Sequence, residues 1–451
     1  MDSITRNKQY AQWLVVLAAM ILPFLLIRFF PGFYHASDVD DFRRWSQAWE
    51  ADWRSVYVNC ERCNYPFVGT LLSGGVMSAI NIETFARLAN RFRYYLAVVD
   101  ALNILALWLI LKNLQVKNAP LWAGVIGLLP SSWLGSSVWG QIDGIGQFLI
   151  LLFFLLLIWF NRQNRSVGQA YLFAALAGFL LSLMLLTKQL IYFSVFALGM
   201  IFIANILTRF GVSIRGVLAG AIALLAFSLP VFLVDLSLKL KDPYFSHLQY
   251  ILATGSQHGS VVTYTGFNLW VFFSNDPLGS SRLPVPVQIG SQTLFSVVPY
   301  SAGIFLFLTV NALLVLVFAK GIHRSVLPEE ALQRQFILIS LVYLALVNLG
   351  FNLTLTGTHE RYLYHFYPFI LAACLALLNR PGFFNRSMLA VLLAGACLYG
   401  VYLFAYLNRW VLPSSLAALR WMSAIHLMLF GYILFAAIRQ FGLRMFDLSQ
   451  S

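Results

Sequence analysis

Three carboxylates stand close together near the start of the chain, at Asp38, Asp40 and Asp41, and two arginines follow them at Arg43 and Arg44. Close carboxylates repel one another, which raises the pKa of one of them and favours base chemistry or metal binding. They can also be solvated loop residues, or ion pairs with the two arginines, and we expect that simpler arrangement for Asp41. Asp38 and Asp40 are therefore the candidate catalytic residues.

A second group of ionisable residues lies far along the chain, at His359, Glu360 and Arg361. Its simplest interpretation is a charge pair at the end of a helix. The guanidinium of an arginine, however, presents a fork of donors that suits phosphate oxygens. Together with Lys188, which also stands at the end of an apolar run, these cations predict a phosphate-binding site formed by Lys188, His359 and Arg361.

The segment Trp139-Gly140-Gln141-Ile142-Asp143 directly precedes a long apolar run. Asp143 can simply cap the following helix, or complement the helix dipole from its first turn. Its occurrence beside the other polar motifs also allows a role in binding.

Composition shows which elements must position these residues. Hydrophobic residues make up 60% of the 451 residues and charged residues only 10%. A soluble domain is about a quarter charged, so a cytosolic enzyme, a disordered protein and a secreted disulfide scaffold are excluded. The lipid bilayer requires every backbone polar group to be satisfied internally, which predicts an all-α polytopic membrane protein.

A spanning helix needs about 20 mostly apolar residues. Windows of this kind predict about twelve transmembrane helices, at residues 10–30, 92–111, 119–137, 143–160, 168–187, 189–208, 215–236, 294–318, 336–356, 362–378, 388–407 and 418–438. The first window lacks a small-residue cleavage site, so we expect a retained helix rather than a cleaved signal peptide.

The formal net charge of +13 would suggest nucleic acid in a soluble protein, but in a membrane protein positive residues gather in the cytoplasmic loops. We expect membrane lipids and no nucleic acid as partners. With both termini cytoplasmic, each inner segment carries at least two basic residues: Arg6, Lys8, Lys112, Lys117, Arg162, Arg165, Arg209, Arg215, Lys320, Arg324, Arg334, Arg380, Arg386, Arg439 and Arg444. The short outer turns carry only Lys188, Arg361 and Arg409.

This orientation places the polar motifs, and so the active site, on the extracytoplasmic face. Polar groups at the edge of the hydrocarbon are costly and indicate function. The lack of a C-terminal retention signal favours a bacterial inner (plasma) membrane.

Two long extracytoplasmic segments, 31–91 and 237–293, interrupt the single membrane domain predicted for residues 1–451. In the first, Phe42, Trp45, Trp49 and Trp53 recur at helical spacing within 41–53, which predicts an amphipathic helix at the membrane surface. The second contains Gly, Ser and Pro and is expected to be a partly mobile lid.

Cys60 and Cys63 form a CxxC pair in the first of these segments. An oxidising compartment would allow a local disulfide, and the alternative is two free thiols. A zinc site is not favoured, because no second cysteine pair lies nearby.

Taken together, the motifs resemble those of the GT-C superfamily of membrane glycosyltransferases. The similarity is to bacterial proteins related to the second mannosyltransferase of GPI-anchor synthesis, and to dolichyl-phosphate-glucose-dependent glucosyltransferases. It rests on motifs that occur in the same order between residues 30 and 370: Asp38, Arg44-Trp45, Tyr65-Pro66, Trp139–Asp143, Lys188-Gln189, Asn268–Trp270 and His359–Leu363. The chain lacks the second proline of the family's Tyr-Pro-Pro and the proline of its Lys-Pro-Gln.

The resemblance implies transfer of a hexose, mannose or glucose, from a polyprenyl- or dolichyl-phosphate donor, with inversion, to a hydroxyl of a glycan, glycolipid or protein. Asp38 would be the general base, and Asp40 an alternative base or acceptor ligand. Lys188, His359 and Arg361 would neutralise the leaving phosphate. The implied sugar- and acceptor-binding residues are Tyr65, Trp139, Gln141, Asp143, Gln189, Asn268, Trp270 and Glu360. No cofactor is expected to be required, with a divalent metal left open.

Three other functions remain open. A polymerase or ligase of surface polysaccharide would use a lipid-pyrophosphate donor on the same face. A twelve-helix secondary transporter would place its charges near the bilayer midplane. A catalytically silent family member would have a scaffolding role.

Overall fold

The computed structural model describes residues 3–60, 62–80, 82, 84–161, 166–241, 244–289, 292–323, 329–378, 382–408 and 415–442. Six of the basic residues used to predict the orientation lie outside these ranges, namely Arg162, Arg165, Arg324, Arg380, Arg409 and Arg444.

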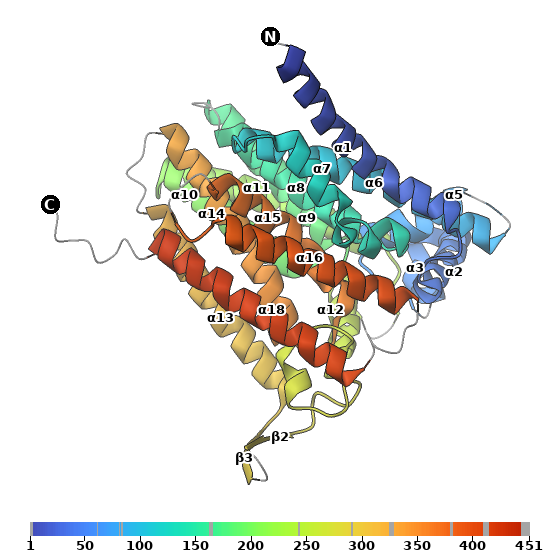
Figure 1. Ribbon diagram of the computed structural model, residues 1–451. Helices are drawn as coiled ribbons and strands as arrows, with labels where there is room; N and C mark the ends of the chain where they lie inside the picture. The colour runs from blue at the N-terminus through green and yellow to red at the C-terminus, as the bar shows by residue number, and fades with distance from the viewer. Residues whose placement is uncertain are drawn as a thin grey trace. The chain divides into compact units, whose positions relative to one another are not determined.

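Long apolar helices dominate the fold (Figure 1). Within the described ranges, ten helices are long and apolar enough to cross a membrane. They are α1 (Ser3–Phe29), α6 (Phe85–Asn113), α8 (Asp143–Asn161), α9 (Val167–Leu185), α10 (Tyr192–Phe210), α11 (Ile214–Ser237), α13 (Pro299–His323), α14 (Glu329–Thr354), α16 (Arg386–Leu407) and α18 (Leu416–Ala437). The predicted all-α polytopic membrane protein is confirmed.

Two predicted windows do not form one continuous helix, and a third, 294–318, begins inside strand β3 (Gln292–Val297) before α13. In 119–137, α7 (Ala119–Leu128) is followed by a 3-10 turn from Pro130 and a π-helical turn at Leu134–Val138. Pro130 has no N–H to donate and holds the preceding Leu129 in an extended conformation, which ends α7. In 362–378, a 3-10 helix (Glu360–His365) precedes α15 (Tyr367–Leu377), with Pro368 in the first turn of α15.

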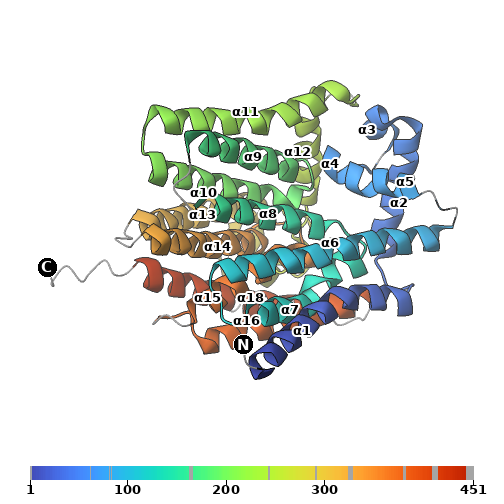
Figure 2. The ribbon, with the colours of Figure 1, turned by 90° about the horizontal axis from the view of Figure 1, so that it is seen from above.

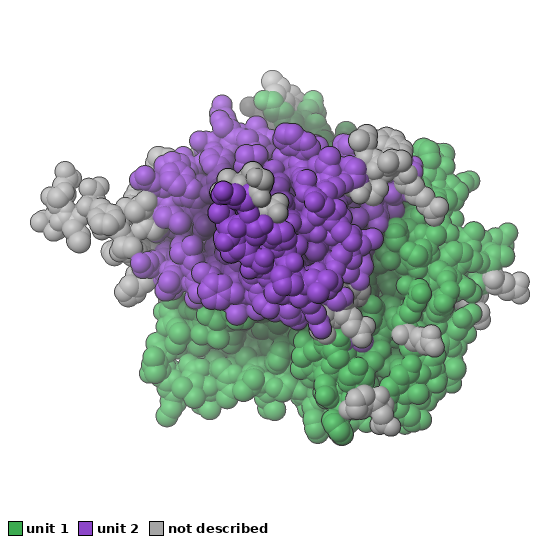
Figure 3. Space-filling model, turned by 90° about the horizontal axis from the view of Figure 1, so that it is seen from below, with its two compact units in different colours: residues 1–253 green, residues 254–451 purple. Residues whose placement is uncertain are grey.

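The chain divides into two compact units, residues 1–253 and 254–451, which Figure 3 colours separately. In the first unit, α1 packs on α6 and α7, α6 packs on α8, and α9 lies alongside α11 (Figure 2). Close packing of α9 on α11 depends on Gly178, because a Cβ atom there would lie 2.2 Å from the backbone oxygen of Ala223.

The segment 31–91 folds into short helices within the first unit. These are α2 (Ala36–Asp52), α3 (Val56–Asn59), α4 (Phe67–Thr70) and α5 (Val76–Ile80), with a 3-10 turn at Trp53–Ser55 and a π-helical turn at Leu71–Gly75. The helix predicted within 41–53 is confirmed as part of α2, and its place at the membrane surface stays a prediction. Its apolar face is covered by protein, since the rings of Phe42 and Trp45 pack on Tyr65 and on Phe92 of α6.

The segment 237–293 contains regular secondary structure. Helix α12 (His247–His258) leads into β1 (Thr263–Tyr264), a 3-10 turn (Leu269–Phe272) and β2 (Val285–Ile289). Its role as a lid stays a prediction.

The second unit is built around α14, which packs on α13, α15 and α18. Strand β1 pairs in parallel with β4 (Thr358–His359), and β2 pairs antiparallel with β3 (Gln292–Val297). The short β1–β4 pair matters for the site, because it fixes the backbone directly before Glu360.

Candidate active site

Asp38 lies in the first turn of α2, where the helix dipole favours a negative charge. The indole Nε1 of Trp139 donates to Asp38 Oδ2 at 2.8 Å, and His35 Nδ1 lies 3.2 Å from the same oxygen. The His35 ring also stacks on Trp139, with 4.9 Å between ring centroids. Two residues predicted from separate motifs are thus brought together, and the carboxylate, 17% exposed, is held in one orientation.

Gly140 allows this close approach. Its φ of +88° is in the left-handed region, and a Cβ atom there would lie 2.6 Å from the side chain of Val39 in α2. The backbone N–H of His35 donates to the carbonyl of Trp139 at 3.1 Å, which ties the two segments together. A side chain at position 140 would push Trp139 away from Asp38.

The two other carboxylates of the cluster exchange the roles expected from the sequence. Asp40, not Asp41, pairs with both neighbouring arginines, at 2.7 Å from Arg43 Nη2 and 3.0 Å from Arg44 Nε. Hydrogen bonds from Arg43, and then from Arg44, outweigh partial burial and lower the pKa of Asp40. A carboxylate stabilised in this way is a weaker base, so the structure favours Asp38 over Asp40.

Asp41 instead faces Arg62, at 3.6 Å. Its pKa is raised, mainly by burial and further by the charges of Asp38 and Asp40. The expected repulsion among the three carboxylates is therefore present, and Asp41 is the residue that shows its effect.

A buried polar cluster lies between the Trp139–Asp143 motif and Lys188. Lys188 Nζ is 2.8 Å from Asp143 Oδ1 and 3.2 Å from Gln141 Oε1, and the Tyr65 hydroxyl donates to the same Gln141 oxygen at 3.0 Å. Lys188 also lies over the Tyr65 ring, 5.0 Å from its centroid. Four residues predicted to bind sugar or phosphate thus contact one another, and the charge of Lys188 is balanced by a buried carboxylate.

Close backbone packing places Lys188 in this cluster. A Cβ atom at Gly69 of α4 would lie 1.9 Å from the carbonyl oxygen of Thr187, so only glycine fits there. The Gly69 N–H donates to the carbonyl of Leu186 at 3.0 Å. The side-chain amide of Gln189, another predicted site residue, donates to the carbonyl of Asn64. Gln189 therefore positions the loop that carries Tyr65.

Residues that are not among the predicted site residues also hold the loop between α3 and α4. The Tyr57 hydroxyl donates to the Tyr65 carbonyl at 2.8 Å and lies 3.1 Å from His247 Nε2. Burial lowers the pKa of His247 to about 4 and raises that of Tyr57, so both side chains are neutral at pH 7. Tyr250 donates to the Cys63 carbonyl at 3.0 Å.

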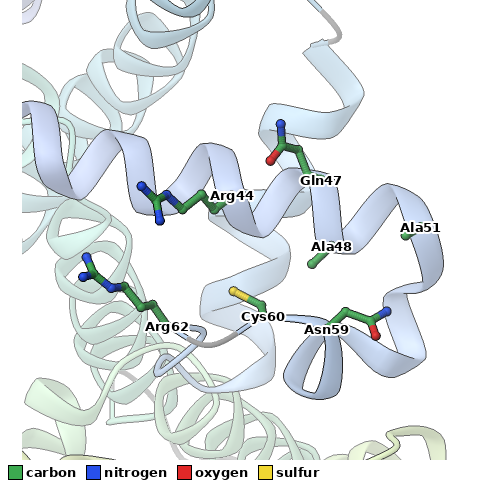
Figure 4. Close-up of a pocket in the computed structure, with 7 residues that line it drawn as sticks. All are labelled: Arg44, Gln47, Ala48, Ala51, Asn59, Cys60 and Arg62. Atoms are coloured by element: carbon green, nitrogen blue, oxygen red, sulfur yellow. The ribbon is translucent and has the colours of Figure 1, made fainter.

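Cys60 and Cys63 are free thiols, and both are buried. Cys60 lines a cavity of about 410 Å³ and points toward α2 (Figure 4). The other lining residues are Arg44, Gln47, Ala48, Ala51, Asn59 and Arg62. A hydrogen bond from Cys63 lowers the pKa of Cys60 to about 7 despite its burial, while burial raises the pKa of Cys63.

In the second unit, Glu360 is the centre of the predicted His359–Arg361 site. It is 1% exposed, its Oε1 accepts from Arg361 Nη1 at 3.3 Å, and His359 Nδ1 lies 3.8 Å from Oε2. The Thr265 hydroxyl also donates to Oε2. Burial acts to raise the pKa of Glu360, but His359, Arg361 and Thr265 together lower it to about 2. Like Lys188, the predicted phosphate-binding cations here have a carboxylate partner.

Asn268 and Trp270, predicted to bind sugar or acceptor, form hydrogen bonds to the backbone around this cluster. The Asn268 amide donates to the carbonyls of Val262 and Leu355 at 2.9 and 3.2 Å, and its oxygen accepts from the Trp270 N–H. Trp270 Nε1 donates to the carbonyl of Thr354 at 2.6 Å. These bonds hold the two chain segments that carry Thr265 and His359.

His359 stacks on Tyr264, with ring centroids 4.9 Å apart and planes within 5°. This contact follows from the parallel register of β1 and β4, in which Tyr264 pairs with His359. Thr265, which is not among the predicted site residues, reaches Glu360 from a left-handed backbone with φ of +80°.

Arg93 is a further positioning residue that is not among the predicted site residues. It is fully buried in α6 and donates to the carbonyls of Pro31, Phe33 and Ser137 at 3.0, 2.9 and 3.3 Å. It therefore joins the segment before α2 to the turn before Trp139. Arg87 and Arg91 stand close to it near the start of α6, and the sequence gives no sign that Arg93 differs from them.

Within the described ranges, no group of three or more His, Cys, Asp or Glu side chains is arranged to hold a metal ion. Neither known family models nor curated proteins match the chain. Fold and composition define the class as an integral, all-α polytopic membrane protein with apolar helices exposed to membrane lipids.

Proposed function

We propose that the chain is a membrane glycosyltransferase that moves a hexose from a polyprenyl-phosphate donor to an acceptor hydroxyl on the extracytoplasmic face, with inversion. The observation that carries the proposal is the partly exposed Asp38 carboxylate, oriented by Trp139 and His35. A general base needs this combination of access and fixed direction. Of these two partners, Trp139 belongs to a motif on which the resemblance to GT-C enzymes rests.

In the proposed step, the acceptor oxygen attacks the anomeric carbon of the donor sugar while Asp38 removes the hydroxyl proton. The bond between that carbon and the phosphate oxygen breaks, and the lipid phosphate leaves with the bonding electrons. Attack opposite to the leaving group inverts the anomeric configuration. His35 and Trp139 are positioning residues for Asp38, because they contact it and hold its orientation.

Negative charge on the leaving phosphate needs nearby cations. Arg361, which is buried at 8% exposure, and the half-buried His359 of the second unit carry the groups suited to this role, and Glu360 lies beside both of them. Lys188 is more deeply buried with Asp143. We therefore assign the donor phosphate first to Arg361 and His359, and assign to Lys188 the positioning of Gln141 and Tyr65.

A transporter is the second candidate, and one observation favours it. Both buried clusters hold an ion pair with extra polar partners, and ionisable groups of this kind also form substrate paths in transporters. A polysaccharide polymerase with a lipid-pyrophosphate donor fits the same residues as the first proposal and differs in the product released.

The test uses the full chain in nanodiscs with a panel of synthetic polyprenyl-phosphate sugars and crude membrane acceptors. Release of the free lipid phosphate is followed for the wild type, Asp38→Asn and the matched control Asp40→Asn. Release from one donor that is lost in Asp38→Asn supports the proposal and identifies the sugar. Absence of release from every donor, in a correctly folded protein, overturns it in favour of a pyrophosphate donor or transport.

A further inference from the structure

The β2–β3 hairpin extends from the second unit beside the beginning of α13 (Figure 1). Its large apolar side chains are exposed: Phe295 is 58% and Leu294 55% accessible, and Leu283 just before β2 is 64%. A two-stranded hairpin alone is only marginally stable in water, because it has no partner for its apolar face. The exposed side chains therefore call for a contact outside the chain.

The strand register gives the hairpin two different faces. Val285 pairs with Val297, and Val287 pairs with Phe295, and these four side chains share one face because alternate residues of a strand point the same way. Pro286 and Ser296 pair on the opposite face. The irregularity between Val287 and Gln288 leaves Leu294 as the extra residue of a bulge.

The hairpin continues directly into a membrane-spanning helix. Strand β3 ends at Val297, and the apolar span of α13 begins at Pro299. The surface of α13 is open to lipid, with Phe305 73% and Leu308 60% exposed. The apolar face of the hairpin, exposed at Phe295 and half-buried at its three valines, is therefore continuous along the chain with the exposed apolar surface of a spanning helix.

The distribution of charge supports the same environment. No Asp, Glu, Lys, Arg or His occurs between Arg282 and Lys320, so the uncharged stretch includes the whole hairpin as well as most of α13. A water-exposed hairpin that avoids pairing with other strands normally carries charges, most often lysine. An uncharged hairpin next to a spanning helix is instead suited to lipid.

Arg282 and Tyr300 lie where the hairpin meets the first turn of α13. The Arg282 guanidinium lies over the Tyr300 ring, 5.2 Å from its centroid, and the Tyr300 N–H donates to the carbonyl of Ser281 at 3.0 Å. Tyrosine and arginine are typical of the membrane interface. There the tyrosine ring and the aliphatic stem of arginine lie against apolar groups, while the polar ends of both side chains reach water. These contacts also fix the base of the hairpin to the first turn of α13.

We propose that the β2–β3 hairpin lies in the interfacial layer of the membrane, with the face formed by Val285, Val287, Phe295 and Val297 against the acyl chains and the face of Pro286 and Ser296 toward the headgroups. The hairpin thereby anchors the beginning of α13. This inference does not depend on the proposed transferase activity.

The test uses the photoreactive residue p-benzoylphenylalanine in the full chain, reconstituted in vesicles of phosphatidylethanolamine and phosphatidylglycerol. Phe295→p-benzoylphenylalanine is a near-conservative aromatic change, and Ser296→p-benzoylphenylalanine is the matched control on the other face. Both positions are exposed, so neither change disturbs the core, and elution as a single species verifies the fold. Adducts are identified by mass spectrometry after irradiation.

We expect lipid adducts at position 295 with at least several-fold higher yield than at position 296. Equal yields at the two positions, or no lipid adduct at position 295, would overturn the proposal. A cross-linked dimer through position 295, without lipid adducts, would also overturn it and assign the face to a second copy of the chain.

Discussion

The ammonium of Lys188 lies 2.8 Å from the carboxylate of Asp143, and both side chains are almost completely buried, at 4% and 0% exposed. Gln141 and Tyr65 complete the cluster, so the pair has hydrogen-bonding partners in addition to its own Coulomb attraction. A buried pair of this kind is costly to break from one side, because the remaining charge is left without compensation.

The first prediction concerns the stability of this pair. Lys188→Met should lower the free energy of unfolding by about 3–5 kcal/mol, and Lys188→Met combined with Asp143→Leu should recover part of that loss. Thermal unfolding of the detergent-solubilised protein measures both. Lys239→Met is the control, since the Lys239–Asp52 pair is exposed and its loss should leave the melting temperature nearly unchanged. An unchanged melting temperature in Lys188→Met would contradict a stabilising role for the pair.

The second prediction concerns the proposed base. Asp38→Asn should reduce the rate of transfer by about 10²–10⁴-fold, while folding is retained, because the amide still fits beside Trp139 but cannot accept the proton. Asp40→Asn should retain most of the activity, since Asp40 is engaged by Arg43 and Arg44. If Asp38→Asn keeps more than about a tenth of the wild-type rate, Asp38 is not the base.

The third prediction separates donor from acceptor binding. Arg361→Ala should raise the Michaelis constant for the lipid-phosphate donor or lower the rate at saturating donor, and leave the Michaelis constant for the acceptor unchanged, because the guanidinium is assigned to the donor phosphate. Arg420→Ala is the matched control, an arginine of the same unit that bonds the carbonyl of Val271. Equal donor kinetics in the wild type and Arg361→Ala would exclude the phosphate assignment.

The helices could be predicted from the sequence because their cause is local. An apolar run of about 20 residues spans the hydrocarbon whatever surrounds it. The breaks at Pro130 and Pro368 also have a local cause, but a window average conceals it, since proline is counted by hydropathy and not by its missing N–H.

The candidate site could be predicted only in part, because its contacts join distant parts of the chain. Asp38 and Trp139 are 101 residues apart, and only the folded turn at Gly140 brings them together. The pairing of Asp40 with Arg43 and Arg44 follows the three- and four-residue spacing of a helix surface. Asp41 also stands three residues before Arg44. Which of the two carboxylates pairs with the helix arginines therefore depends on which side of α2 faces Arg62.

The fourth prediction concerns pH. Glu360 has a pKa of about 2 in the folded protein and an ordinary value near 4.5. A lowered pKa means that the ionised carboxylate contributes stability above about pH 4.5, and that this contribution is lost as the pH falls toward about 2. Glu360→Gln should therefore lower the melting temperature at pH 7, and its difference from the wild type should shrink as the pH falls to about 4 and below.

The control for this experiment is Glu50→Gln, which changes an exposed glutamate on α2. It should leave the melting temperature nearly unchanged at each pH, because exposed surface substitutions have small effects. A difference between the wild type and Glu360→Gln that stays constant across the pH range would show that the carboxylate charge is not what stabilises the site.

The fifth prediction concerns the two thiols beside the cavity of Figure 4. Because a hydrogen bond from Cys63 lowers the pKa of Cys60 to about 7, the thiolate of Cys60 should form as the pH rises through 7. Alkylation by iodoacetamide, mapped by peptide mass spectrometry, should reach half its maximal rate near that pH. Cys63 should stay unmodified, since burial raises its pKa and it does not line the cavity.

Two variants test the cause of the shift in Cys60. Cys63→Ala removes the donor, so the midpoint for alkylation of Cys60 should move up toward about 8.5, the ordinary value of a thiol. Cys63→Ser keeps a hydroxyl donor at the same place and should hold the midpoint closer to 7. An identical midpoint in the alanine variant and the wild type would mean that the lowered pKa comes from the backbone hydrogen bonds of Arg62 and Cys63 rather than from the Cys63 thiol.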